Sequence, residues 1–229
     1  MNVIEIKNLT KIYNGSSVKV KAVDDVDMVI EEGEFTAIVG PSGSGKTTLL
    51  NMIGGLDEPS SGTIIVDGTN LCKLNKKQLV DFRLKNIGFV FQAYNLIPVL
   101  TARENVSFIM ELQGKNKEKI NDRSLEILEA VGLGERLNSR PNQLSGGQQQ
   151  RVAVARALAS KPKFIIADEP TANLDSKSTE NLLDIMEELN RKENITFIFS
   201  THDQRVVNKA RRVIVLEDGK ILKDEKKTG

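Results

Sequence analysis

Short runs of β-branched and aromatic residues alternate along the chain with segments of helical spacing. The runs are strand candidates, and they lie at residues 3–6, 35–39, 63–66, 87–91, 163–167, 195–199 and 212–216. Between many of them, apolar residues recur on one helical face, as in Leu125, Leu128 and Val131 and in Leu182, Ile185 and Leu189. This alternation predicts an α/β fold with a mainly parallel core sheet.

Two regions depart from the alternation. Residues 1–33 have strand-like patterning with turn signals at 14–17 and 31–34, which predicts a small antiparallel β layer. From about 93 to 160 the strand candidates vanish and polar, helix-favouring segments accumulate. We therefore expect a single domain, 1–229, in which 1–92 and 161–229 form the core and about 93–160 form an α-helical subdomain. The C-terminal stretch KDEKKTG is expected to be solvated.

Composition narrows the classes of partner. The 229 residues are 39% hydrophobic and include 32 lysines and arginines, 31 aspartates and glutamates, and one cysteine, Cys72. This balance argues against a nonspecific nucleic-acid binder. The N-terminal MNVIEIKNLT lacks signal-peptide features, and no apolar run approaches the ~18 residues that cross a bilayer. We expect a reducing, cytoplasmic location, with any membrane role exerted through a partner.

A glycine-rich segment carries the strongest chemical signal. GPSGSGKT at 40–47 matches G-x-x-x-x-G-K-[ST], and it lies between a strand candidate and a helix-like segment. Its backbone N–H groups and the helix N-terminus favour phosphate. We expect Lys46 to reach the outer phosphates and the Thr47 hydroxyl to ligate Mg²⁺; an ordinary glycine-rich turn is the alternative. The predicted nucleotide-binding residues here are Gly40, Pro41, Ser42, Gly43, Ser44, Gly45, Lys46, Thr47 and Thr48.

The apolar run FIIADEP at 164–170 brings two carboxylates to the end of a strand. Ligands bind at the carboxyl ends of strands in open α/β sheets. We expect Asp168 to hold Mg²⁺, directly or through water, and Glu169 to orient or deprotonate an attacking water. The alternative is an acidic N-cap of the next helix.

A second helix start favours anions. Ser145, Gly146 and Gly147 open a segment of helical spacing, although a serine-capped helix without a ligand has the same pattern. Only one set of carboxylates accompanies the two phosphate-binding helix starts. Two chains that meet head to tail, each lending this segment to the nucleotide of the other, would reconcile these observations.

Beside these motifs, LSGGQ at 144–148 resembles the signature of ATP-binding cassette (ABC) ATPases, and the family's other motifs follow in order over nearly the whole chain. The resemblance implies a P-loop NTPase fold with a RecA-like core and an α-helical signature subdomain, ATP and Mg²⁺ as ligands, and an ATP-dependent homodimer. It implies that Tyr13 stacks on adenine, for which a surface or strand tyrosine is the alternative. It also implies that Asp175 acts across the dimer, although this chain has Asn173-Leu174-Asp175 where the family often has Ser-Ala-Leu-Asp. The signature residues expected on the partner's nucleotide are Ser145, Gly146, Gly147 and Gln148.

The single histidine, His202, follows the strand candidate at 195–199. A parallel neighbour would bring it to the same sheet edge as Lys46 and Glu169. The resemblance implies that a neutral His202 donates to the γ-phosphate; a satisfied histidine beside a helix cap is the alternative. The implied catalytic set is Glu169, His202, Lys46 and Gln92, and the implied metal set is Thr47, Gln92 and Asp168.

Residues 88–106 most resemble the macrolide-exporter and lipoprotein-release (MacB/LolD) branch of the family. That resemblance implies an ATPase that drives a permease through a groove near 92–110, in export, lipoprotein release or mechanotransmission, from the inner face of the cell membrane. One alternative is a non-transport ABC ATPase acting on DNA or ribosomes, but coiled coils, zinc modules and paired cassettes are not visible. A second is a P-loop small-molecule kinase, which LSGGQ and Glu169 disfavour.

Overall fold

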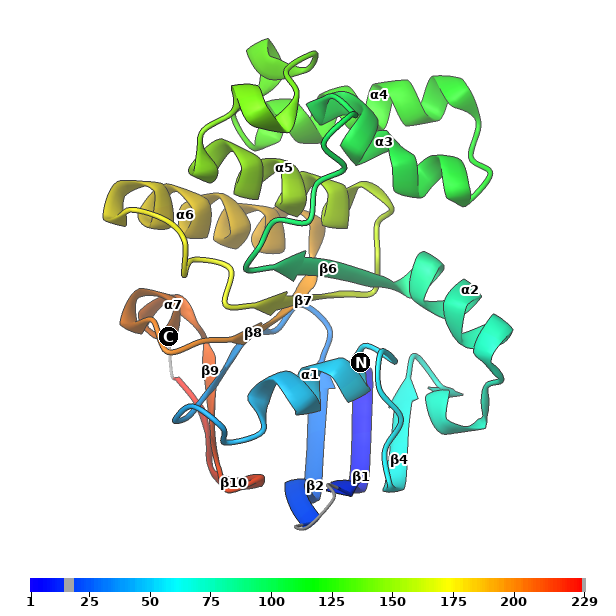
Figure 1. Ribbon diagram of the computed structural model, residues 1–229, viewed down its shortest axis with the longest axis vertical. Coiled ribbons are helices and arrows are strands. Elements are labelled where there is room, and N and C mark those ends of the chain that lie inside the picture. Colours follow the sequence, from blue (N-terminus) through cyan, green and yellow to red (C-terminus); the bar gives the residue numbers. More distant parts are fainter. Residues whose placement is uncertain (15–18, 228–229) are drawn as a thin grey trace.

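A computed structural model describes residues 1–14 and 19–227, and a six-stranded sheet runs through its centre (Figure 1). The sheet order is β10-β9-β3-β8-β7-β6, and every neighbouring pair is parallel except β9 and β10. Its strands are β3 (Phe35–Val39), β6 (Ile87–Phe91), β7 (Phe164–Asp168), β8 (Thr196–Ser200), β9 (Arg212–Glu217) and β10 (Lys220–Lys226). The predicted α/β fold with a mainly parallel core sheet is confirmed.

An antiparallel layer in the order β2-β1-β4-β5 lies beside this sheet. It comprises β1 (Asn2–Asn14), β2 (Lys19–Glu31), β4 (Ser61–Val66) and β5 (Thr69–Asn70). Helix α1 (Lys46–Ile53) packs between the two sheets, because its apolar side chains share one core with Ile4 and Ile6 on one side and Ile166 and Ile198 on the other. The predicted turn at 14–17 lies mostly outside the described residues.

Helices cover the opposite face of the central sheet. They are α3 (Ala102–Leu112), α4 (Lys117–Ala130), α5 (Gly146–Ala159) and α6 (Ser176–Glu193), and their apolar side chains pack with Phe35, Phe197 and Phe199. Short side chains let α5 lie close to its neighbours, since Ala153, Ala155 and Ala159 are fully buried. Figure 1 shows α3, α4 and α5 stacked at one end of the molecule, away from β1, β2 and β4. Two further helices flank strands of the central sheet in the sequence: α2 (Lys76–Asn86) precedes β6, and α7 (Gln204–Lys209) follows β8.

One expectation from the sequence about packing is wrong. Leu125 is 37% exposed, because the buried face of α4 is formed by Ile120, Ile127 and Leu128. Residues 223–227 are exposed, as expected of a solvated stretch, but residues 223–226 also belong to β10, which Arg212 of β9 holds through two hydrogen bonds of 2.7 and 2.6 Å to Asp224. The remaining residues 228–229 of that stretch lie outside the described part. No helix in the described ranges is long and apolar enough to cross a bilayer.

Candidate nucleotide site

The glycine-rich loop follows β3 and ends where α1 begins. Gly45 caps α1 with a φ of 101°, and a Cβ there would lie 2.1 Å from the carbonyl oxygen of Ala22 on β2. Only glycine therefore allows this close approach to β2. The Lys46 ammonium reaches back across the loop and donates to the carbonyl oxygens of Gly40 and Pro41 at 2.8 and 2.9 Å. The loop thus places a cation and the start of α1 together, as phosphate binding requires.

The loop forms one wall of a cleft of about 550 Å³. Sheet order explains the other walls, because β3, β8, β7 and β6 are successive neighbours whose carboxyl ends meet at one edge. Each strand end supplies a predicted side chain: His202 after β8, Glu169 after β7 and Gln92 after β6. The lining residues are Ala22, Gly40, Ser42, Gly43, Ser44, Gly45, Lys46, Thr47, Thr48, Gln92, Glu169, Ala172, Ser200 and His202.

Three of these lining residues were missed by sequence reasoning: Ala22, Ala172 and Ser200. Ser200 is the last residue of β8, so its place at a strand end was a usable signal. Ala22 reaches the cleft through the packing of β2 on the loop, which local patterns do not reveal. Pro41 and Asp168 do not line the cleft themselves.

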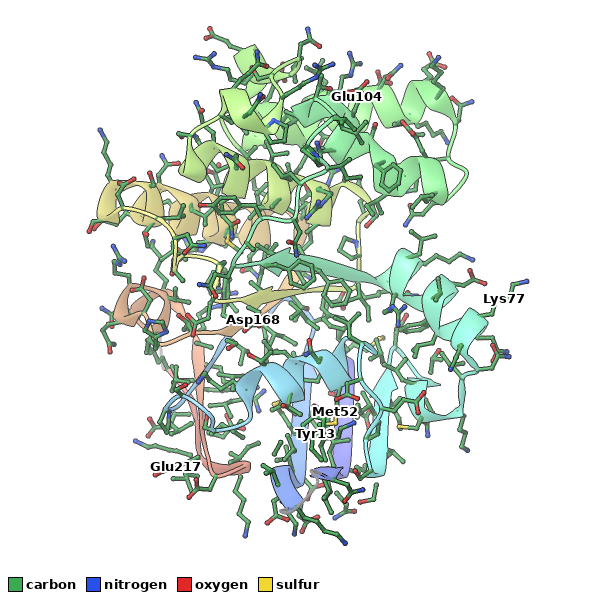
Figure 2. The ribbon with its side chains drawn as sticks, in the orientation of Figure 1. Tyr13, Met52, Lys77, Glu104, Asp168 and Glu217 are labelled. Atoms are coloured by element: carbon green, nitrogen blue, oxygen red, sulfur yellow. The ribbon has the colours of Figure 1, made fainter. Side chains whose placement is uncertain are left out.

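Asp168 reaches the cleft through Thr47. The Thr47 hydroxyl lies 3.4 and 3.3 Å from the two carboxylate oxygens, and Figure 2 labels Asp168 at the end of β7, on the side of α1. The described residues contain no cluster of three or more His, Cys, Asp and Glu side chains. Mg²⁺ does not need one, since it is held by one or two protein oxygens together with waters and substrate phosphates. A hydroxyl and a carboxylate at this spacing therefore fit that ion.

Glu169 and His202 face each other across the ends of β7 and β8. His202 Nδ1 lies 2.9 Å from Glu169 Oε1, and the Glu169 amide donates to the Ser200 carbonyl at 2.9 Å. The other carboxylate oxygen, Oε2, is buried and has no hydrogen-bond partner within the described chain. The backbone of Glu169 is left-handed, with φ of 47°, which is uncommon outside glycine and occurs at functional sites.

The tautomer of His202 follows from this contact. With Glu169 ionised, the form in which it could act as a base, its carboxylate only accepts hydrogen bonds, and Nδ1 of His202 is then the donor in this contact. A neutral imidazole then has an unprotonated Nε2, which accepts and does not donate. The sequence leads us to expect that a neutral His202 donates to a γ-phosphate. Such donation requires His202 to give up its hydrogen bond to Glu169, so that an N–H group of the ring can point to the phosphate.

Tyr13 lies outside the cleft lining. Its hydroxyl donates to Asp57 at 2.6 Å, and the Lys11 ammonium lies 4.9 Å from the ring centroid and also binds Asp57. Burial, followed by the hydrogen bond to Asp57, raises the pKa of Tyr13. Tyr13 is 43% exposed, so part of the residue remains open to a flat ligand.

The signature segment is separate from the cleft. Ser145 accepts from the Gln148 amide at 3.3 Å, while the Gln148 side chain accepts from the Ser145 amide at 2.8 Å, which forms a capping box on α5. These residues line a hollow of about 190 Å³ together with Gly147, Arg151, Lys177, Ser178 and Asn181. It shares no lining residue with the cleft of about 550 Å³. The glycines allow tight packing, since a Cβ on Gly146 would lie 2.9 Å from the Tyr94 hydroxyl.

The segment after Glu169 is tied to the end of β6. The Asn173 side-chain amide donates to the Gln92 carbonyl at 3.0 Å. Asp175 caps α6 and accepts from the amide and hydroxyl of Ser178 at 2.9 and 2.6 Å. These two bonds lower the pKa of Asp175.

A mainly apolar groove of about 410 Å³ lies between α2, β6 and α3. Its apolar lining comprises Val80, Leu84, Ile87, Phe89, Phe91, Ile97, Phe108, Ile109 and Ala157. Arg156 lies at this groove and donates to the carbonyl oxygens of Asn95 and Tyr94 at 2.5 and 2.9 Å. The groove therefore adjoins the segment that begins with Gln92.

Known proteins are similar in sequence to nearly the whole of this chain. The uncharacterized ABC transporter ATP-binding protein MJ1508 of Methanocaldococcus jannaschii is 48% identical over 219 residues, which cover 96% of this chain and 97% of that protein. The macrolide export ATP-binding/permease protein MacB of Hyphomonas neptunium is 46% identical over 96% of this chain, but the match covers only 34% of MacB.

A solved structure and a family model agree with these relatives. The dimeric structure of the ATP-binding cassette MJ0796 of Methanocaldococcus jannaschii, in a post-hydrolysis state bound to ADP and Pi, matches with a TM-score of 0.90 and 43% identity, covering 99% of both chains. A family model described as ABC transporter matches residues 23–172, well over half of the chain. The chain therefore belongs to the ABC transporter family, as an ATP-binding domain that hydrolyses ATP.

Proposed function

We propose that two copies of this chain close head to tail on two ATP molecules, so that the signature segment of each copy completes the site of the other. This proposal is supported by the separation of the two sites: the hollow at Ser145 and the cleft at Lys46 share no lining residue within one chain. Each of them contains the N-terminus of a helix, whose free N–H groups favour phosphate. The dimeric structure of the similar cassette MJ0796, bound to ADP and Pi, supports the association of two copies.

Within each site, we assign the chemistry to the strand ends. Lys46 and the loop bind the phosphates, and Tyr13 offers its exposed ring to the adenine. Thr47, Asp168 and Gln92 would hold Mg²⁺, which when bound neutralises phosphate charge. Glu169 orients or deprotonates the attacking water, and His202 holds Glu169 through Nδ1. Residues 1–92 and 161–229 form this core, while about 93–160 carry the signature helix.

The apolar groove is the site that we assign to a permease. Its occupant is a helical segment with an apolar face, because Phe89, Phe91 and Phe108 offer apolar surface between α2 and α3. MacB is named an ATP-binding/permease protein, and this chain spans about a third of it. We therefore place the chain at the inner face of the cell membrane, in the macrolide-exporter and lipoprotein-release branch, with its permease outside the 229 residues and no nucleic-acid partner.

Mixing two inactive variants tests the head-to-tail assembly. K46A disables the loop of its own chain, and S145A disables the segment that serves the partner. A heterodimer of the two then has one intact site, so the mixture should recover about one quarter of the wild-type ATPase rate, since about half of randomly formed dimers are heterodimers. Each variant alone should stay inactive.

A recovery no greater than the sum of the two variants would mean that Ser145 acts on its own chain's nucleotide. The control is a mixture of K46A with E169Q. Each substitution disables the cleft of its own chain, so both sites of the heterodimer are inactive and the mixture should not recover activity.

A separate experiment tests coupling to a permease. F108D should abolish stimulation of ATP hydrolysis by the permease in proteoliposomes, while basal hydrolysis remains.

A further inference from the structure

One buried hydroxyl at the nucleotide cleft has no role in the function proposed above. Ser200 lines the cleft and is 1% exposed, and its Oγ has no hydrogen-bond partner within the described residues. A buried hydroxyl without a partner is costly, because it has lost its hydrogen bonds to water. Such a group is expected to find a partner in some state of the protein.

The sheet places Ser200 beside Asp168. Strands β7 and β8 are parallel neighbours, and their register pairs these two residues. Side chains alternate along a strand, and Ile166 and Ile198, two positions earlier, both belong to the core around α1. Asp168 and Ser200 therefore project from the same face of the sheet, on strands about 4.8 Å apart.

The Asp168 carboxylate has room for another donor. An ionised carboxylate offers about four lone-pair sites. The hydroxyl of Thr47 contacts it at 3.3 and 3.4 Å, which is long for an O–H···O bond. A hydroxyl on the neighbouring strand is suited to fix the plane of this carboxylate.

We propose that Ser200 is a positioning residue for Asp168: its hydroxyl donates to the carboxylate when nucleotide binds and holds it toward the cation side of the cleft. This inference rests on the role assigned to Asp168 above. It adds a second hydroxyl, from β8, to the one that Thr47 supplies from α1. In this role Ser200 acts through Asp168, and we assign it no contact with the reacting atoms.

The Mg²⁺ requirement for nucleotide binding tests this role without measuring turnover. The full chain is titrated with a fluorescent ATP analogue at increasing Mg²⁺ and in EDTA. S200A should raise the half-saturating Mg²⁺ concentration about tenfold, which is the effect of one hydrogen bond to a charged group. Binding in EDTA and the melting temperature without nucleotide should not fall, because the ligand-free protein loses no hydrogen bond. S200T, which keeps the hydroxyl, should restore the requirement toward wild type.

Ser124 provides the matched control. Its Oγ is also buried without a partner in the described chain, but it lies on α4, away from the cleft. S124A should leave the Mg²⁺ requirement unchanged. An unchanged requirement in S200A, or an equal shift in S124A, would overturn the proposal. D168N distinguishes failure of the role assigned to Asp168 from failure of the role proposed for Ser200. If D168N leaves the Mg²⁺ requirement unaltered, the role of Asp168 is wrong. If D168N has a large effect and S200A has none, only the role of Ser200 is rejected.

Discussion

Replacing Gly45 with alanine tests whether the phosphate loop needs glycine for its fit against β2. At Gly45 the φ is 101° and a Cβ would lie 2.1 Å from the Ala22 carbonyl oxygen. Gly43 is a matched control in the same loop, because its φ is 80° but a Cβ there meets no atom within 4 Å. The two variants share a strained backbone and differ in the clash with β2.

The magnitude follows from that difference. Left-handed backbone costs an alanine about 1–2 kcal/mol, so G43A should weaken ATP binding by about 30-fold at most. G45A must in addition move the loop by about 1 Å to relieve the clash, and a displacement of that size at a catalytic site lowers the rate by about 10²-fold. Affinity for a fluorescent ATP analogue and steady-state ATPase rates of the purified chain measure both effects.

The reasoning would be refuted if G45A and G43A lost activity equally, since the contact with Ala22 would then be irrelevant. Thermal denaturation of both variants accompanies these assays. A folded G45A with poor ATP binding is the expected result. Near wild-type hydrolysis by G45A would show that β2 yields to the added methyl group.

Further predictions concern catalysis, packing and pH. E169Q should lower hydrolysis by about 10²–10⁴-fold and accumulate an ATP-bound dimer on gel filtration; monomer with unchanged turnover would contradict the assigned base. R212M should lower the free energy of unfolding by about 3–5 kcal/mol in urea, because the largely buried Glu34 carboxylate loses its guanidinium partner together with Asp224, whereas D224N, which keeps the pair with Glu34, should cost less. Arg205 lowers the pKa of Asp203, so the stability from this carboxylate is present at neutral pH and is lost as pH falls through the lowered value. D203N should therefore flatten the acid limb of a stability-against-pH curve below about pH 4, and an unaltered limb would reject this assignment.

Local signals account for what the sequence predicted well. The strands are short apolar runs, and the loop at 40–47 is a contiguous motif, so each can be read without knowledge of contacts. The convergence of Glu169, His202 and Lys46 at one cleft also followed from sequence, because the carboxyl ends of parallel strands meet at one edge.

Contacts distant in sequence account for what was missed. Strand β10 is mainly charged and is recognisable only through its pairing with β9 and through Arg212. The Asp57 partner of Tyr13 is 44 residues away, so the chain alone does not show that this phenol is already engaged. Ser200 carries no motif, and its proposed role depends on the burial of its hydroxyl and on its register with Asp168, which the sequence does not show.

Strand β10 also bears on how copies of this chain behave when crowded. It forms one edge of the central sheet, and an open sheet edge can template pairing with another chain and lead to aggregation. The exposed lysines Lys220, Lys223 and Lys226 lie along this edge, and charged side chains of this kind disfavour pairing of a sheet edge with another chain. The charged composition that hid β10 from sequence analysis is thus a safeguard against fibrous association, and it leaves the proposed nucleotide-dependent dimer as the favoured form of self-association.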